Sequence, residues 1–253
     1  MKLVRDTWLL FSWSVAATLR NPTWAIIGLF QPLCYLLLFG PLLQSLSNVP
    51  GFPPGGAQTV FTPGVMIMMG IFSTAFVGFG LIGEIRSGFI ERLRITPLSR
   101  LALALGRILC DVVMLLVQAL LLVLLALPLG LRPNLVGLLL VLGLLVLLGI
   151  CMASCSYALA LLLKSENGLS SLLNTLTLPL FLLSGITLPL TLAPAPLRTL
   201  GSFNPLAYAV NTARALFLGH IASWTVVEGF GTIGILAVLA LIWAARAFQR
   251  ATL

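Results

Sequence analysis

Few residues of this chain could carry covalent chemistry, and most of them are scattered. The cysteines are Cys34, Cys110, Cys151 and Cys155, and the single histidine is His220. Cys151 and Cys155 share one helix face, so they could form a metal or redox pair or pack as small apolar side chains. Hydrolytic chemistry needs a base or a set of ligands within reach of the reacting atom. No histidine or carboxylate lies near the pair in sequence. The pattern therefore favours packing and argues against a hydrolytic membrane enzyme.

The sequence contains no phosphate-binding loop. Such a loop needs Gly-Lys followed by Ser or Thr, and the only lysines are Lys2 and Lys164. Lys164 precedes Ser165 but follows Leu163 instead of glycine. We therefore expect no catalytic residue, no cofactor and no metal on this chain. A transporter built from it would need either a separate ATPase or an ion gradient.

The acidic residues argue against an ion gradient. An ion-coupled carrier normally keeps ionisable groups at the middle of the membrane. Asp111 lies one turn from Arg107 near the end of a predicted span, and Glu84 and Glu228 lie at the ends of others. These carboxylates are expected to be interface anchors or helix-end pairs, and Asp111 has Arg107 to pair with. An external motor is therefore favoured, and an ion-coupled secondary carrier is the outside alternative.

Composition predicts the fold class. The 253 residues are 60% hydrophobic and 8% charged, with a mean hydropathy of +1.14, whereas a soluble domain is about a quarter charged. We predict an all-α polytopic membrane protein, a single transmembrane domain over residues 1–253 with six transmembrane helices. The net charge of +8 is spread over loop positions, so it indicates topology and not nucleic-acid binding. The predicted spans cover about 24–46, 60–82, 105–129, 135–163, 169–190 and 230–248.

The basic residues orient these spans. With six crossings, most of them fall on one side of the membrane, which the positive-inside rule makes cytosolic, and both termini lie there. Only Arg132, Arg198 and Arg214 fall on the other side. The predicted cytosolic cations are Lys2, Arg5, Arg20, Arg86, Arg92, Arg94, Arg100, Arg107, Lys164, Arg246 and Arg250.

The segment 84–97, between the second and third spans, interrupts the apolar sequence with charges. Burying five charges at roughly 2.5–3.5 kcal/mol each would cost on the order of 12–17 kcal/mol, so this segment must lie in water. Ile85, Phe89 and Leu93 recur at helical spacing, and Pro97 ends the helix. We therefore predict a short amphipathic helix on the cytosolic side, suited to contact a partner.

Two further segments are not predicted to span the membrane. Residues 1–22 contain a predicted helix over 2–20 that either lies along the cytosolic membrane surface or extends the first span. Residues 191–228 are broken by prolines and are too polar for a span, so we predict short extracellular or re-entrant helices there. In that segment Asn204 is suited to cap a helix and Pro205 to occupy its first position.

Two motifs resemble a known family. The run GEIRSGFIERLRITPLSRLALALGRIL resembles the segment between the second and third spans of type-2 ATP-binding-cassette (ABC) export permeases. The run FLLSGITLPLTLAPAPLRTLGSFNPLAYAVNTARALFLG resembles that family's fifth-span exit and extracellular segment. Chain length, predicted span number and motif order agree along essentially the whole chain. Within the family, the sequence looks most like the drug-resistance permeases of the daunorubicin type.

The resemblance implies that transport and nucleotide binding reside on separate subunits. In that family each permease is half of a transmembrane dimer and binds a separate nucleotide-binding subunit through the helix after the second span. Residues 84–97 would then be the coupling helix, with the helix at residues 1–22 as a second contact. The extracellular segment would include Asn204, Pro205 and Arg214. The implied coupling residues are Glu84, Arg86, Phe89, Glu91, Arg92 and Arg94.

Two predicted spans offer faces for a substrate pathway. The second has a small-residue stripe at Gly70, Thr74 and Gly78 that allows close helix approach. Methionine and phenylalanine occupy its other sides and form an adaptable apolar surface. The fifth span has a polar face, which should point to protein or water and not to lipid. Both faces either line one pathway or serve interhelix packing. The candidate pathway residues are Met69, Phe72, Phe76, Asn174, Thr177, Phe181 and Ser184.

The resemblance and these faces together imply a permease subunit that exports amphipathic or hydrophobic cargo, such as a drug, natural product or lipid. The expected location is a bacterial cytoplasmic (inner) membrane. Expected partners are two copies of a cytosolic ABC ATPase that holds ATP and Mg, a second copy of this chain, and membrane lipid. The alternative is a polysaccharide, lipo-oligosaccharide or lipid-linked glycan export permease.

Overall fold

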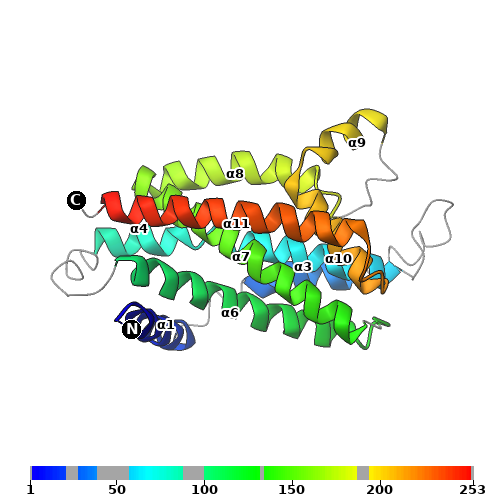
Figure 1. Cartoon of the computed structure of the whole chain (residues 1–253), viewed down its shortest axis with the longest axis horizontal. Coiled ribbons are helices and arrows are strands. Elements are labelled where there is room, and N and C mark those ends of the chain that lie inside the picture. Colours follow the sequence, from blue (N-terminus) through cyan, green and yellow to red (C-terminus); the bar gives the residue numbers. More distant parts are fainter. Residues whose placement is uncertain are drawn as a thin grey trace.

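The computed structural model describes residues 2–20, 28–38, 57–87, 100–131, 134–186 and 194–251, and within these ranges the chain is helical without strands (Figure 1). A helix Gly28–Leu38 precedes the longer elements. The remaining helices are α1 (Lys2–Arg20), α3 (Ala57–Ala75), α4 (Gly78–Arg86), α6 (Arg100–Ala126), α7 (Leu135–Leu163), α8 (Glu166–Leu182), α9 (Ala195–Ser202), α10 (Pro205–Phe217) and α11 (Trp224–Ala251).

The predicted helical membrane fold is confirmed, and four of the described helices are candidate membrane spans. The helices long and apolar enough to cross a membrane are Gln58–Arg86, Leu101–Ala126, Leu135–Leu163 and Trp224–Arg250. The first of these combines α3 and α4. The predicted first span is described only over Gly28–Leu38, and α8, in the predicted fifth span, has 17 residues. The number six therefore stays a prediction.

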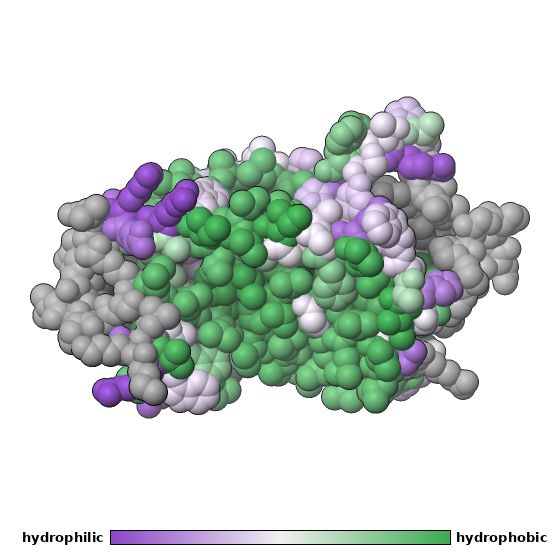
Figure 2. All heavy atoms as spheres, viewed as in Figure 1, coloured by the Kyte–Doolittle hydropathy of each residue, from purple (hydrophilic) through white to green (hydrophobic). Residues whose placement is uncertain are grey.

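The long helices form a bundle with distinct ends (Figure 1). The described N- and C-terminal residues lie at one end, together with α1 and the end of α4, while α9 and α10 lie at the opposite end. Figure 2 shows a broad apolar face between hydrophilic side chains near both ends. This distribution is what a bundle needs when lipid surrounds its middle and water bathes its ends.

Helix α7 is the centre of the bundle. Its sequence is apolar on all sides, which is typical of a helix enclosed by other helices or lipid. It packs against α3, α4, α6, α10 and α11. Asn134 caps its start by accepting from the Val136 amide at 3.2 Å. The chain then turns sharply at Lys164, which adopts a left-handed backbone with φ of 50°, and Ser165 caps α8.

Helix α1 lies against the first turns of α6. A Cβ at Gly106 would come 2.8 Å from the Leu10 Cβ and 3.1 Å from the Thr7 carbonyl oxygen. The lack of a side chain at Gly106 thus allows the two helices to touch. The predicted helix over 2–20 is confirmed, and its outer face exposes Val4 and Trp8. Its position at a membrane surface stays a prediction.

Candidate functional site

A cavity of about 800 Å³ opens between α1, the helix Gly28–Leu38, the α3–α4 span, α6 and α7. One wall is aromatic and includes Phe72, Phe76 and Phe79. The Phe72 and Phe76 ring centroids are 6.3 Å apart, and those of Phe76 and Phe79 are 5.9 Å apart. Trp13 of α1 also lines this cavity. Such a surface suits a large apolar group without demanding one shape.

Polar side chains line the rest of the cavity. Ser73 donates to the Gln118 side-chain oxygen at 2.9 Å, which joins the α3 wall to the α6 wall. Glu84, Arg107 and Asp111 also line the cavity. The cavity thus combines aromatic, amide and charged groups, which is the chemistry that an amphipathic molecule would match.

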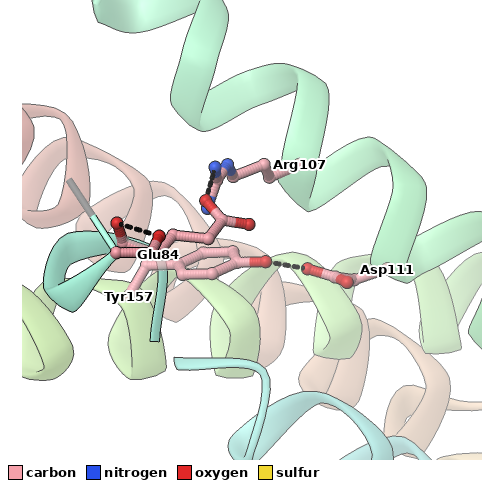
Figure 3. A network of polar contacts seen from close by, with 5 residues as sticks. Glu84, Arg107, Asp111 and Tyr157 are labelled. Atoms are coloured by element: carbon pink, nitrogen blue, oxygen red, sulfur yellow. Dashed lines mark hydrogen bonds and ion pairs between the residues drawn. The ribbon is translucent and has the colours of Figure 1, made fainter. Parts of the chain in front are cut away.

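The charged groups form a short network, shown in Figure 3. Arg107 of α6 forms an ion pair with Glu84 of α4, and the Arg107 side chain is only 7% exposed. The Tyr157 hydroxyl of α7 donates to the Asp111 carboxylate at 2.5 Å. Arg107 thus forms its ion pair with Glu84 on another helix instead of with the expected Asp111. Asp111 accepts its hydrogen bond from Tyr157, a residue that local sequence rules do not single out.

A second ion pair lies at the end of α4. Arg86 donates to Glu166, the first residue of α8, at 2.8 Å, and both side chains are about half exposed. Together with the Glu84–Arg107 pair, it ties the last turn of α4 to both α6 and α8. The last turn of α4 is therefore in polar contact with two neighbouring helices.

The span that carries the aromatic wall is broken at the cavity. Helix α3 ends at Ala75, and α4 starts at Gly78 after a turn at Phe76 and Val77. A broken helix leaves backbone groups without intrahelical partners. Here Ser156 of α7 satisfies one on each side: its hydroxyl donates to the Ala75 carbonyl at 2.5 Å and accepts from the Gly78 amide at 2.9 Å.

The small residue at Gly78 is required by this contact. A Cβ there would lie 2.7 Å from the Ser156 carbonyl oxygen and 2.7 Å from its hydroxyl. At Gly70, one end of the predicted small-residue stripe, a Cβ would come 3.0 Å from a Leu148 methyl group. The stripe thus allows α7 to approach closely along the α3–α4 span.

The predicted pathway residues divide into two groups. Phe72 and Phe76 line the cavity, whereas Met69 is fully buried in the core. Phe181 of α8 meets Phe72 edge to face with centroids 5.7 Å apart. Ser184 is buried and donates to the Phe181 carbonyl at 2.5 Å.

The polar face of α8 lies apart from the cavity lining. Asn174 is exposed and donates to the Ser170 hydroxyl at 3.3 Å, while Thr177 is half-buried. The structure thus brings the two predicted faces together at the Phe72–Phe181 contact. The described lining of the cavity contains neither Asn174 nor Thr177.

Of the predicted coupling residues, Glu84 and Arg86 are described, and both are ion-paired. Phe89, Glu91, Arg92 and Arg94 lie outside the described residues. The described part of the predicted coupling helix is therefore the end of α4.

At the opposite end of the bundle, Arg214 holds three segments together. Its Nε donates to the Val60 carbonyl at 3.0 Å, and one terminal nitrogen donates to the Gly185 and Ile186 carbonyls at 2.8 and 3.1 Å. Burial lowers the pKa of Arg214 to about 10, so the side chain stays charged at neutral pH. Its positive charge strengthens each of these hydrogen bonds.

The predicted cap of α10 is confirmed. The Asn204 side-chain oxygen accepts from the Leu206 amide at 3.0 Å, and its amide nitrogen donates to the Leu180 carbonyl at 2.6 Å. Pro205 occupies the first turn, as the sequence predicts. Asn204 thus caps α10 and also anchors it to the end of α8.

Among the described residues, no group of three or more His, Cys, Asp or Glu side chains lies close enough to hold a metal ion.

Comparison with known proteins agrees with this architecture. The family described as "ABC-2 type transporter" matches residues 5–218. The chain belongs to this family. It therefore shares the membrane domain of ABC-2 type transporters, and the cavity, the broken span and the ion pairs are features of this ABC-2 chain.

Curated relatives of this ABC-2 chain are named as permeases. A putative transport permease, ycf38, of Cyanophora paradoxa is 30% identical over 211 residues, which cover 81% of this chain and 71% of the relative. The ycf38 protein of Pyropia yezoensis is 28% identical, covering 85% and 75%. The daunorubicin resistance ABC transporter permease protein DrrB1 of Streptomyces coeruleorubidus is 26% identical, covering 81% and 72%. The chain is a transport permease of the ABC-2 type.

Proposed function

We propose that this chain is the permease subunit of an ATP-driven exporter that moves amphipathic or hydrophobic cargo, such as a drug, natural product or lipid, out across a bacterial cytoplasmic membrane. Two copies of the chain form the transmembrane unit, with six spans each and both termini in the cytosol. Two copies of a separate cytosolic ABC ATPase bind ATP and Mg and supply the energy. The chain itself performs no hydrolysis.

The observation that carries the proposed cargo class is the mixed lining of the 800 Å³ cavity. Phe72 and Phe76 offer an apolar wall, while Gln118 and Asp111 offer polar atoms nearby. A bare ion would gain little from the aromatic wall, and a highly polar sugar would lose hydration against it. A molecule with an apolar body and a few polar groups matches both walls.

The α4 contacts suggest how the ATPase subunits would act on this cavity. The proposed coupling helix, residues 84–97, begins at the last turn of α4, where Glu84 and Arg86 bond to α6 and α8. ATP-driven closure of the ATPase subunits would push on this helix. Because α4 is separated from α3 by the break at Phe76 and Val77, it can tilt as a unit and reshape the aromatic wall.

The exposed polar face of α8 supports the dimer. Asn174 and Thr175 are exposed in the single chain, yet polar side chains within a span should face protein or water. A second copy packed against α8 would cover them. With the native cysteines replaced by alanine, Asn174→Cys should crosslink to itself in membranes, whereas Val238→Cys, 58% exposed on α11, should remain uncrosslinked. Equal behaviour of the two variants would exclude a dimer through α8.

The central test is a transport assay of the chain co-purified with whatever ABC ATPase a neighbouring gene encodes. In vesicles, a panel of amphiphiles should stimulate ATP hydrolysis and accumulate in an ATP-dependent manner. Phe76→Ala should weaken this stimulation, because Phe76 lines the cavity. Phe230→Ala is the matched control, since Phe230 is also half-buried but packs in the core away from the cavity.

Three outcomes would count against the proposal. If no ABC ATPase binds the chain, the exporter assignment fails. If a lipid-linked glycan is the cargo that stimulates hydrolysis, the alternative glycan exporter replaces it. If transport follows a proton or sodium gradient without ATP, the chain is a secondary carrier. Glu91→Ala with Arg92→Ala then tests the coupling helix, whose role is wrong if coupled activity survives unchanged.

A further inference from the structure

A second hollow, of about 420 Å³, lies between the C-terminal ends of α7 and α11. It is separate from the 800 Å³ cavity described above and shares no lining residue with it. We call it the basic groove, and its main features are Lys164, Arg246 and Arg250, with Leu162 and Trp243 beside them. Figure 2 shows hydrophilic side chains gathered at this end of the bundle, directly bordering the apolar face.

Among the described residues, the basic groove holds positive charge without a compensating carboxylate side chain. Its lining contributes Lys164, Arg246 and Arg250, all exposed, and no acidic residue. The acidic residue closest in sequence, Glu166, is already bound to Arg86 at 2.8 Å. Three cations that line one hollow repel one another, and an anion among them would relieve that repulsion.

The backbone places one of these cations at some cost. Lys164 has φ of 50°, a left-handed conformation in which glycine is the unstrained residue. Complementing the dipole of α11 could explain Arg250 in its last turn. Lys164 stands at the C-terminal end of α7 and complements the dipole of that helix in the same way, so two helix C-termini bring cations to one hollow.

The sides of the basic groove are apolar and face outward. Leu162 is 62% exposed and Trp243 is 39% exposed, and both belong to helices long and apolar enough to span the membrane. Tryptophan is enriched where the headgroup region meets the hydrocarbon core. The groove therefore offers cations at the level of lipid headgroups and apolar side chains just beneath them.

We propose that the basic groove binds one anionic phospholipid. Its phosphate lies among Lys164, Arg246 and Arg250, and its acyl chains lie along Leu162 and Trp243. Basic pockets between membrane helices on the cytoplasmic side recognise such headgroups. A soluble anion would use the three cations alone, whereas a lipid also covers the exposed leucine and tryptophan. The bound lipid would pin the end of α11 to the end of α7.

The test uses the quenching of Trp243 by brominated lipids. The full-length chain is placed in phosphatidylcholine bilayers that contain a small fraction of either brominated phosphatidylglycerol or brominated phosphatidylcholine. The Trp243 signal is the difference between the native chain and Trp243→Phe, which removes the contribution of the other tryptophans. Phosphatidylglycerol should quench this signal much more strongly. Equal quenching by both lipids would overturn the proposal.

The cations are tested with Arg246→Gln combined with Arg250→Gln. Glutamine preserves helix propensity, so α11 should still form, and the melting temperature checks this. Each lost cation should reduce the preference for phosphatidylglycerol about fivefold, which corresponds to roughly 1 kcal/mol, giving about 25-fold for the pair. Lys164→Gln, outside any helix, should reduce it about fivefold and keeps the test valid if α11 is disturbed.

Two controls separate a lipid site from less specific attraction. Arg5→Gln with Arg20→Gln removes the same charge from exposed positions on α1 and should leave the lipid preference unchanged. An equal loss in this variant would show general attraction to an anionic surface and refute the groove. Inorganic phosphate should not restore the Trp243 signal in phosphatidylglycerol bilayers. If it does, the groove binds free phosphate and not a lipid.

Discussion

The sharpest prediction concerns Ser156, the residue that bonds to both sides of the helix break. Ser156→Ala removes a donor from the Ala75 carbonyl and an acceptor from the Gly78 amide. Each intramolecular hydrogen bond makes a net contribution of about 0.5–1.5 kcal/mol to stability. Side-chain hydrogen bonds between membrane helices average about 0.6 kcal/mol. Two bonds therefore amount to about 1–3 kcal/mol. The cost falls in the upper half of this range, because Ser156 is buried and water cannot replace it.

The chain supplies a matched control two residues away. Ser154 is on the same helix and is fully buried, but its hydroxyl has no hydrogen-bond partner in the described structure. Ser154→Ala therefore removes the same atom without breaking a bond, and should change stability by no more than about 0.5 kcal/mol.

Thermal unfolding of the two variants in the same detergent measures the difference. For a chain of this size, each kcal/mol corresponds to a shift of about 2–4 °C. Ser156→Ala should therefore melt about 4–8 °C lower, at a cost near 2 kcal/mol, while Ser154→Ala should melt close to the native chain. If both variants shift alike, Ser156 does not hold the break and its assigned role is wrong.

Three further predictions concern Gly78, the Glu84–Arg107 ion pair and Arg214. Gly78→Ala should lower the melting temperature, because its Cβ would come 2.7 Å from the Ser156 carbonyl oxygen, whereas Gly83→Ala, with nothing within 4 Å of its Cβ, should be neutral or stabilising. A double-mutant cycle with Glu84→Gln and Arg107→Gln, followed by melting temperature and by cargo-stimulated ATPase, should show a coupling of about 1–3 kcal/mol, and additive effects would exclude the ion pair. Arg214→Gln should destabilise the chain by about 3 kcal/mol or more, because three buried carbonyls lose a charged donor; hydrogen exchange should then rise at the start of α3 and the end of α8, and unchanged exchange there would contradict the assignment.

The elements that sequence alone could predict are those governed by local rules. The spans at α6, α7 and α11 follow from long apolar runs, since only a helix satisfies its own backbone in lipid. Asn204 and Pro205 mark the start of α10 because capping depends on adjacent residues. The second span is predicted to end at Ile82, because Glu84 and Arg86 are costly in hydrocarbon, whereas the apolar helix runs on to Arg86.

The site depends on contacts between distant segments, which local rules cannot supply. The break after Ala75 is held by Ser156, which lies 81 residues further along the chain. Arg107 has Asp111 one turn away, yet it bonds to Glu84 on another helix because packing brings that carboxylate closer than the neighbouring one. The hydrogen bond at Asp111 comes from Tyr157, 46 residues further along the chain.

The polar face of α8 shows a different limit. A polar face in a span predicts a partner or a cavity, and sequence cannot distinguish between them. Among the described residues of one chain, Asn174 bonds within its own helix and stays exposed. The neighbouring aromatic contact between Phe72 and Phe181 shows how close the two predicted faces come without forming one lining.

The helix break and the ion pairs have different and complementary roles in the proposed coupling. A continuous helix from α3 to α4 would transmit a push on its end along the whole span, and the bundle end fixed by Arg214 at Val60 would resist it. In the proposed coupling, the turn at Phe76 and Val77 would instead let α4 tilt while α3 stays anchored. The ion pairs at the far end of α4 would then carry this tilt to α6 and α8. The aromatic wall spans this turn, with Phe72 on α3 and Phe79 on α4, so a tilt of α4 would move Phe79 relative to Phe72.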